Sequence, residues 1–277
     1  MGEVRFIRLA LVCNVSLAIA TAQQPIINNN GVVNAASYVP LAAPGSLLVV
    51  FGSNLASKTI VASSTPLTTH LQTDTDDIAV QIGGQWAPIY YVSPTQLSVQ
   101  VPWVFATSGS VIMAMTRNGK ESAPVWVPVA QVSPGIFTVS QNGQGMGWAI
   151  NAITGKVAQP AGSIPGVANV GPAAVGDHLF LYATGLGQVA PPVDDGAAPC
   201  PLSGCPPGAW QSTTLGAPAV RVGGVQAKVE FSGLSPQFVG VYQVNFQVPA
   251  EAPTGNSVPL QLQMAGYTSN TVTLAIQ

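Results

Sequence analysis

The sequence predicts an all-β protein built from two tandem copies of one sandwich unit, and three observations support this. Residues 80–91 (VQIGGQWAPIYY) and 97–102 recur as residues 220–231 and 244–249. Each copy alternates apolar and polar residues around a Gly-Gly turn, which is typical of half-buried strands joined by hairpins. Only 6% of the 277 residues are charged, against 29 Gly and 24 Pro, which favours turn-rich β structure over long ion-paired helices.

Residues 1–22 have the organisation of a secretory signal peptide. Two arginines precede a short apolar stretch that ends at Ala20-Thr-Ala22, so we expect cleavage before Gln23. The stretch is short for a membrane span and no second long apolar segment follows, so no span is expected after removal of the signal. Lipidation at Cys13 is the weaker alternative. The expected location is therefore secreted or at the cell envelope, extracellular or periplasmic.

The first unit is expected over residues 23–131. After a short linker it contains a turn, a buried strand and a second turn at residues 43–55, then the Gly-Gly hairpin, then a closing hairpin at residues 110–129. Gly45 and Gly52 bound the buried strand, as Gly176 and Gly185 bound the matching strand of the second unit. Glycine at both ends suits turns that need a positive φ.

Residues 132–172 are predicted to join the units, as a hairpin over residues 132–151 followed by a Pro/Gly-rich connector. The second unit is expected over residues 173–277 and carries two insertions relative to the first, at residues 191–215 and 233–243. Loops that lengthen on a fixed β scaffold often carry specificity, so both insertions are hypotheses for function, with passive elaboration as the alternative.

Two cysteines remain after removal of the signal peptide, Cys200 and Cys205. Two cysteines this close in an exported chain favour a local disulfide that pins a loop. Two free thiols and a metal site are the alternatives. The metal site would have to recruit distant ligands, because the chain has only two histidines, His70 and His178.

Several motifs resemble a known family. The Gly-bounded strand at residues 44–55, the Gly-Gly hairpins, the strands ending in Val-Pro and the last hairpins resemble the IPT/TIG immunoglobulin-like domain in both copies. More narrowly, residues 33–38 (VNAASY), 133–138 (SPGIFT), 183–187 (ATGLG) and 240–249 (GVYQVNFQVP) look like the Solibacter-type uncharacterised C-terminal domain family. The resemblance implies exported β-sandwich modules with no established activity, and it supplies no catalytic residue. We therefore expect two tandem immunoglobulin-like (IPT/TIG-like) β-sandwich domains joined by a β-hairpin connector.

Charge and residue content exclude several function classes. A net charge of −2 with no run of Lys or Arg predicts no basic patch of the kind that binds nucleic acid or anionic lipid. Nucleophilic catalysis needs a base beside a Ser or Cys, but His70 and His178 read as surface or turn residues and no Gly-x-Ser-x-Gly motif is present. No catalytic residue and no cofactor are expected.

An acidic cluster in the first unit is the one metal candidate. Asp74, Asp76 and Asp77 offer alternating oxygen ligands of the kind that calcium takes, but the glycine and the distal glutamate of an EF-hand loop are missing. We weigh calcium binding against a solvated loop that keeps the unit soluble.

Comparison of the two copies points to an aromatic strip. In the second copy Gln226, Lys228 and Glu230 are predicted to face outward, and the matching positions in the first copy are Trp86, Pro88 and Tyr90. Trp126 is also predicted to face outward. Outward aromatic rings can stack on sugars, or they can pack between the two units or beneath the hairpin of residues 132–151.

The sequence thus predicts a non-catalytic exported module for adhesion, matrix contact or protein interaction at the cell surface, with an unidentified protein or polysaccharide as partner. Carbohydrate binding through Trp86, Tyr90 and Trp126 is the second hypothesis. An exported hydrolase is the third, and it lacks a visible acid or nucleophile cluster.

Overall fold

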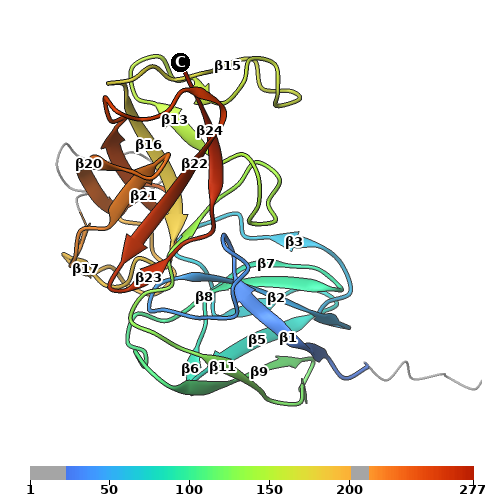
Figure 1. The fold of residues 1–277 in the computed structure, drawn as a ribbon. Coiled ribbons are helices and arrows are strands. Elements are labelled where there is room, and N and C mark those ends of the chain that lie inside the picture. Colours follow the sequence, from blue (N-terminus) through green and yellow to red (C-terminus); the bar gives the residue numbers. More distant parts are fainter. Residues whose placement is uncertain (1–22, 201–211) are drawn as a thin grey trace, which may run out of the picture.

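The computed structural model describes residues 23–200 and 212–277, and every regular element within these ranges is a β-strand (Figure 1). The all-β class is therefore confirmed. Over the same ranges, no helix has the length and apolar character that a membrane crossing requires. The expected signal peptide, with Cys13, lies outside the described residues.

The first unit is a sandwich of two antiparallel sheets. One sheet has the order β1 (Ile26–Asn34), β2 (Leu47–Ser53), β8 (Gln96–Gln100), β7 (Ile89–Val92) and β3 (Ile60–Val61). The other has β10 (Lys120–Glu121), β9 (Ser110–Arg117), β5 (Asp77–Ile82) and β4 (His70–Gln72), with β11 (Val125–Pro128) beside β9 and β6 (Gln85–Trp86) beside β5. Leu48, Val50, Val80, Leu97 and Met113 from the two sheets meet in one buried core.

The second unit repeats this plan in one continuous sheet that folds into two layers. Its main path is β15 (Val170–Gly171), β14 (Val157–Ala158), β13 (Ala149–Asn151), β16 (His178–Thr184), β21 (Tyr242–Gln247), β20 (Val225–Leu234), β19 (Ala219–Val222), β22 (Gly255–Met264) and β23 (Tyr267–Thr268). Branching strands are β12 (Gly135–Ile136), β17 (Val189–Ala190), β18 (Thr213–Thr214) and β24 (Val272–Ile276). Strand β20 belongs to both layers because it pairs with β19 first and then with β21.

The two Gly-Gly turns are equivalent in the structure. Gly83 and Gly84 have φ of +59° and +80°, and Gly223 and Gly224 have +59° and +84°. Each pair forms a two-residue hairpin loop, the turn in which both central residues need a positive φ. The repeat seen in the sequence is therefore a repeat of the same hairpin.

The flanking glycines follow the expected rule at three of four positions. Gly45, Gly176 and Gly185 have φ of +70°, +86° and +78°. Gly52 does not have a positive φ; it is required because a Cβ there would collide with the carbonyl oxygen of Ile26 on the paired strand. The expectation of a positive φ at Gly52 is therefore wrong, and close strand approach is the reason for glycine.

Residues 132–172 do more than join the units. Strands β12 and β13 both pair with β16, so the predicted hairpin extends the sheet of the second unit. The Pro/Gly-rich part adds β14 and β15 to the edge of this sheet, and Val157, Ile164 and Val170 form a small separate core there.

Strand β16 ends where the second unit meets the first (Figure 1), and buried polar contacts near this end hold the units together. The hydroxyl of Thr184 accepts from the Leu47 amide at 2.9 Å and donates to the Gly240 carbonyl at 2.8 Å. The side-chain amide of Asn34, which is fully buried, donates to the Ser133 carbonyl at 2.8 Å. All of these groups have partners, which is what burial of polar groups requires.

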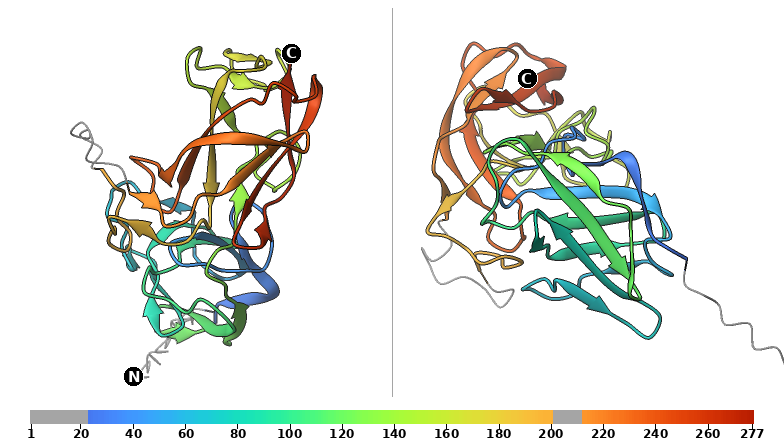
Figure 2. Two further views of the ribbon diagram at one scale, coloured as in Figure 1. Left: turned by 60° about the vertical axis from the view of Figure 1, so that its left-hand side comes forward. Right: turned by 90° about the horizontal axis from the view of Figure 1, so that it is seen from below.

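Residues 191–200, the first described part of the first insertion of the second unit, dock on the first unit (Figure 2). The Trp103 amide donates to a carboxylate oxygen of Asp195 at 2.7 Å, and the Gly196 amide donates to Oε1 of Gln100 at 2.7 Å. The Trp103 side chain packs against the core of the second unit. The described part of this insertion is therefore a clamp between the units.

Candidate functional site

The outer face of the sheet β11-β9-β5-β6 gathers exposed aromatic and apolar side chains. Val80 and Met113 point into the core, so their strand neighbours Gln81, Ile112 and Ala114 point outward. The strand register places Trp126 opposite Ile112 on one side of this face. On the other side it places Trp86 opposite Gln81, which is itself opposite Ala114. We call this surface, made by Gln81, Trp86, Ile112, Ala114 and Trp126, the tryptophan face.

The two tryptophans are exposed to different degrees. Trp126 is 71% exposed and its neighbour Ile112 is 46% exposed. Trp86 is 41% exposed and stacks on His70, with the ring centroids 4.7 Å apart. Large apolar side chains exposed together on one face are typical of an interaction surface. Their exposure does not fit the alternative in which they are covered by the second unit or by residues 132–151.

The separation of the tryptophans follows from the register. They lie three strand spacings apart across the sheet and are offset by two residues along it. With strands about 4.8 Å apart and a rise of about 3.4 Å per residue, their Cα atoms are about 16 Å apart. A ligand that touches both indoles must therefore be long.

Tyr90 does not belong to the tryptophan face, and the predicted strip of Trp86, Pro88 and Tyr90 is wrong. The chain leaves the sheet after Trp86 and joins the opposite sheet as β7. Pro88, which has no amide hydrogen, lies at this crossing and is buried. The matching strand of the second unit, β20, runs through without a break. Tyr90 is half-buried at a bulge of β7 in that other sheet.

Ile112 and Gln81 are members of the face that comparison of the copies did not identify. Alternation along β9 and β5 would have placed both outward, because each lies next to a core residue. Which strands lie beside Trp86 and Trp126 could not be read from the alternation, because it contains no information on the order of strands in a sheet.

The three aspartates do not gather into a calcium site. The buried carboxylate of Asp76 accepts from Nε of Arg117 at 2.7 Å and from the Ser57 amide at 2.9 Å. Asp74 forms an exposed ion pair with Lys58 at 2.9 Å, and Asp77 is exposed. Among the residues that the structure describes, no three acidic, His or Cys side chains come together as metal ligands. The structure therefore favours a structural role for Asp76 over the calcium alternative.

Both histidines lie at the surface. His70 supports Trp86, as described above. Nδ1 of His178 lies 2.8 Å from a carboxylate oxygen of Glu230, and this pairing lowers the pKa of Glu230 below its usual value. Glu230 is one of the outward polar residues predicted for the second copy.

Cys200 is buried and disulfide-bonded, whereas Cys205 lies outside the described residues. The pairing Cys200–Cys205 stays a prediction. We expect the intact mass of the protein to rise by two hydrogens on reduction, and stability to fall by about 2 kcal/mol or less, because the loop closed is short. An unchanged mass would contradict the pairing, and an oxidised Cys205→Ser variant that runs as a crosslinked dimer would show that Cys200 has lost its internal partner.

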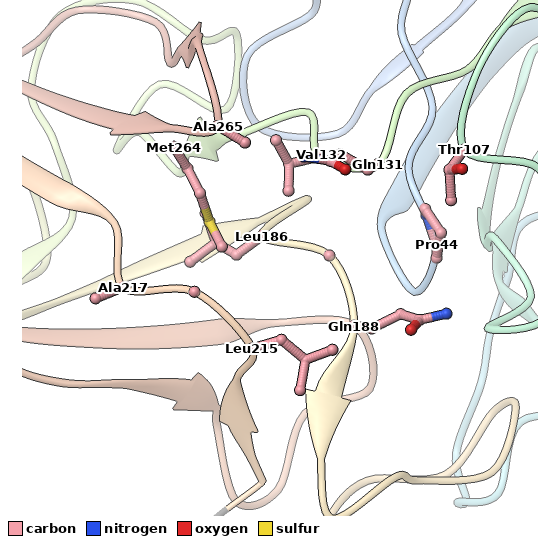
Figure 3. A pocket seen from close by; sticks show the side chains of 12 residues that line it. Pro44, Thr107, Gln131, Val132, Leu186, Gln188, Leu215, Ala217, Met264 and Ala265 are labelled. Atoms are coloured by element: carbon pink, nitrogen blue, oxygen red, sulfur yellow. The ribbon is translucent and has the colours of Figure 1, made fainter.

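A cavity of about 390 Å³ lies where the two units meet (Figure 3). Leu186, Leu215 and Met264 of the second unit line one side, and Pro44 and Thr107 of the first unit line the other. Its lining has no charged side chain and no group suited to acid–base or metal chemistry. It is a property of the junction between the units and not of the tryptophan face.

Comparisons with known proteins agree with the fold. Residues 36–125 match the IPT/TIG domain family, and the two-layer architecture confirms the predicted tandem sandwiches. No curated protein matches the chain at a significant level.

The solved structures to which this chain is similar include two surface glycan-binding proteins. One, from Prevotella bryantii, is 11% identical with a TM-score of 0.27, over 90% of this chain and 41% of that chain. The other, from the mixed-linkage glucan utilization locus of Bacteroides ovatus, is 13% identical with a TM-score of 0.35, over 92% and 47%. Domains 5–6 of the S-layer protein SbsC are 15% identical with a TM-score of 0.28, over 91% and 98%. The chain thus spans less than half the length of either glycan-binding protein.

Proposed function

We propose that the protein is an exported, non-catalytic binding module that holds an extended neutral polysaccharide on the tryptophan face. The observation that carries this proposal is that Trp86 and Trp126 share one open sheet face and lie too far apart for a small ligand. Contact with a protein at the cell surface is the alternative that the test below must separate.

The face has the chemistry that a sugar chain needs. A pyranose ring has an apolar side of C–H groups, and an indole ring offers a flat, electron-rich partner for it. Gln81 lies between the two tryptophans, and Glu121 and Trp86 line the same shallow hollow. These amide and carboxylate groups are placed to bond with sugar hydroxyls beside the stacked rings. A sheet face suits an extended chain lying across the strands.

Export and the absence of catalysis are part of the proposal. Residues 1–22 have the pattern of a signal peptide, and the ordered motifs from Val33 to Pro249 support membership of the Solibacter-type family. The two histidines are engaged with Trp86 and Glu230 and neither lies beside a serine in a relay. We therefore assign binding, not hydrolysis, to this face.

Removal of both indoles is expected to weaken polysaccharide retention strongly. Each stacking contact contributes about 0.5–1.5 kcal/mol beyond area burial, so Trp86→Ala/Trp126→Ala should weaken binding about tenfold or more. The measurement is co-sedimentation of residues 23–277 with cellulose, xylan and chitin, together with affinity electrophoresis in soluble glucans and mannans.

Tyr267→Ala is the matched control, because it removes an exposed aromatic ring of the second unit. It should bind as the unmodified protein does, and all variants should melt within a few degrees of it. Retention that survives in the double variant would move the ligand to another surface. Failure of the unmodified protein to bind any of the polysaccharides would favour a protein partner.

A further inference from the structure

A second concave surface lies between the first unit and the hairpin of residues 132–151. It is a groove of about 370 Å³, near the lower end of the range for ligand pockets. We call it the junction groove; its walls include Tyr38, Val49, Gln96, Phe137, Gln141 and Trp148. It lies in neither the tryptophan face nor the cavity of Figure 3, since it shares no lining residue with them.

Aromatic rings and amides dominate this groove. Tyr38, Phe137 and Trp148 are half-buried, so each ring keeps part of its surface open. None of the lining residues is charged. Across the described ranges, the side-chain amides of Gln96 and Gln141 have no hydrogen-bond partner in the protein. The groove therefore offers ring faces together with free neutral donors and acceptors.

The Tyr38 wall is fixed by its own loop. Tyr38 has φ of +62°, a conformation that is strained for a residue with a bulky side chain. The Asn34 side-chain oxygen holds this turn by accepting from the amides of Ala36 at 2.8 Å and Ser37 at 2.9 Å. The Tyr38 hydroxyl then donates to the Gln141 carbonyl and ties the first unit to the hairpin.

The opposite wall is fixed by the sheet of the second unit. The Phe137 amide donates to the Tyr182 carbonyl at 3.1 Å, and the Trp148 amide donates to the Phe137 carbonyl at 3.0 Å. Trp148 also packs against the small core that includes Val157. Because both walls are set before a ligand arrives, binding would not have to order them.

We propose that the junction groove binds a neutral saccharide unit, with its ring against Tyr38, Phe137 and Trp148 and its hydroxyls bonded to the amides of Gln96 and Gln141. An uncharged lining selects a neutral ligand, and free amides select one rich in hydroxyls. The volume suits the end or a short stretch of a glycan and not a long chain lying flat. This inference shares only the class of ligand with the proposed function, and separate variants test the two sites.

One variant fills the groove and a second removes one of its side-chain amides, and neither removes a structural contact. Ala35 lines it and is partly exposed, so Ala35→Phe should fill it. Gln96→Leu removes one free amide at nearly constant shape. Ala152→Phe, on an exposed turn outside the groove, is the matched control.

The probes are cellobiose, xylobiose and maltose, titrated into residues 23–277 by calorimetry. A disaccharide is too short to touch both indoles of the tryptophan face. We expect at least one to bind, with affinity lost more than tenfold in Ala35→Phe, reduced severalfold in Gln96→Leu, and unchanged in Ala152→Phe and in Trp86→Ala/Trp126→Ala. Melting curves should show that both groove variants remain folded.

Three results would overturn the inference. They are the absence of binding by all three disaccharides, disaccharide binding that Ala35→Phe leaves intact, and binding of decaproline that Ala35→Phe abolishes while no disaccharide competes with it, which would assign the groove to a peptide. Loss of polysaccharide retention in the tryptophan variants with disaccharide binding intact would support both sites independently.

Discussion

Replacing Gly185 by alanine is expected to lower the free energy of unfolding by about 2–5 kcal/mol, from left-handed backbone strain of about 1–2 kcal/mol and overpacking of about 1–3 kcal/mol. Gly185 has φ of +78°, and a Cβ there would overlap the carbonyl oxygen of Ser133. The overlap has no flexible side chain to relieve it, since the atom struck is backbone. Thermal and urea unfolding of residues 23–277 measure the loss.

The effect should reach beyond the turn itself. The Ser133 amide donates to the Gly185 carbonyl at 2.7 Å, and the Ser133 carbonyl accepts from the buried Asn34 side chain. Displacing Ser133 therefore loosens the contact between the two units. At about 2–4 °C per kcal/mol for a chain of this size, the melting temperature should fall by about 10 °C.

Gly176→Ala is the matched control, because Gly176 has φ of +86° but nothing lies within 4 Å of a Cβ placed there. It carries the backbone strain without the overlap, so its loss should be about 1–2 kcal/mol. Equal losses at the two positions would show that the close approach to Ser133 contributes nothing.

The Asp76→Asn substitution is expected to destabilise the first unit by about 3 kcal/mol or more, because it leaves the Arg117 guanidinium without its charge partner. The Asp76 side chain is fully buried and that of Arg117 is 13% exposed, so water screens the pair little. Arg117 also donates to the Asn54 carbonyl at 3.1 Å, which ties the β9 strand to the turn after β2. Chemical denaturation at pH 7 is the measurement.

The same pair gives stability a defined pH dependence. Burial alone would raise the pKa of Asp76, but hydrogen bonds from Ser57 and the Arg117 guanidinium outweigh it and hold the pKa below its usual value. A carboxyl whose folded pKa is depressed contributes stability that is present above its unfolded pKa of about 3.9 and lost as pH falls through the folded value. The unmodified protein should therefore lose stability below about pH 4, and Asp76→Asn should lose less over that range.

Asp74→Asn supplies the comparison, since the Lys58–Asp74 pair is exposed and should contribute little. A denaturation midpoint for Asp76→Asn no lower than that of Asp74→Asn would mean that the buried pair is dispensable. An unchanged acid slope would mean that other carboxyls govern acid unfolding.

The fold was predictable because its signals are local and occur twice. Gly83-Gly84 and Gly223-Gly224 define equivalent hairpins, and alternation around each turn identifies which residues enter the core. The integration of residues 132–172 into the second sheet was not predictable, since β12 and β13 are too short to carry a clear alternating pattern. Their pairing with β16 is a long-range choice that neighbouring residues do not encode.

The candidate site was predictable in part. Trp86 and Trp126 were identified as outward because each occupies an alternating position. Tyr90 was misplaced because the gap-free match to the second copy hid the change of sheet at Pro88. The junction groove was not visible at all, since Tyr38, Gln96 and Trp148 come from three segments that only the packing of the two units brings together.

The break at Pro88 separates the tryptophan face from the contact between the two units. Trp86 lies before the break in β6, which pairs with β5 of the first unit. Pro88 lies after Trp86 and packs beside Gly196 of the clamp between the units. Substitutions on the tryptophan face can therefore be made without altering the contact between the two units. The same separation makes the first unit the natural half to diversify in a library, with the second unit kept constant as its support.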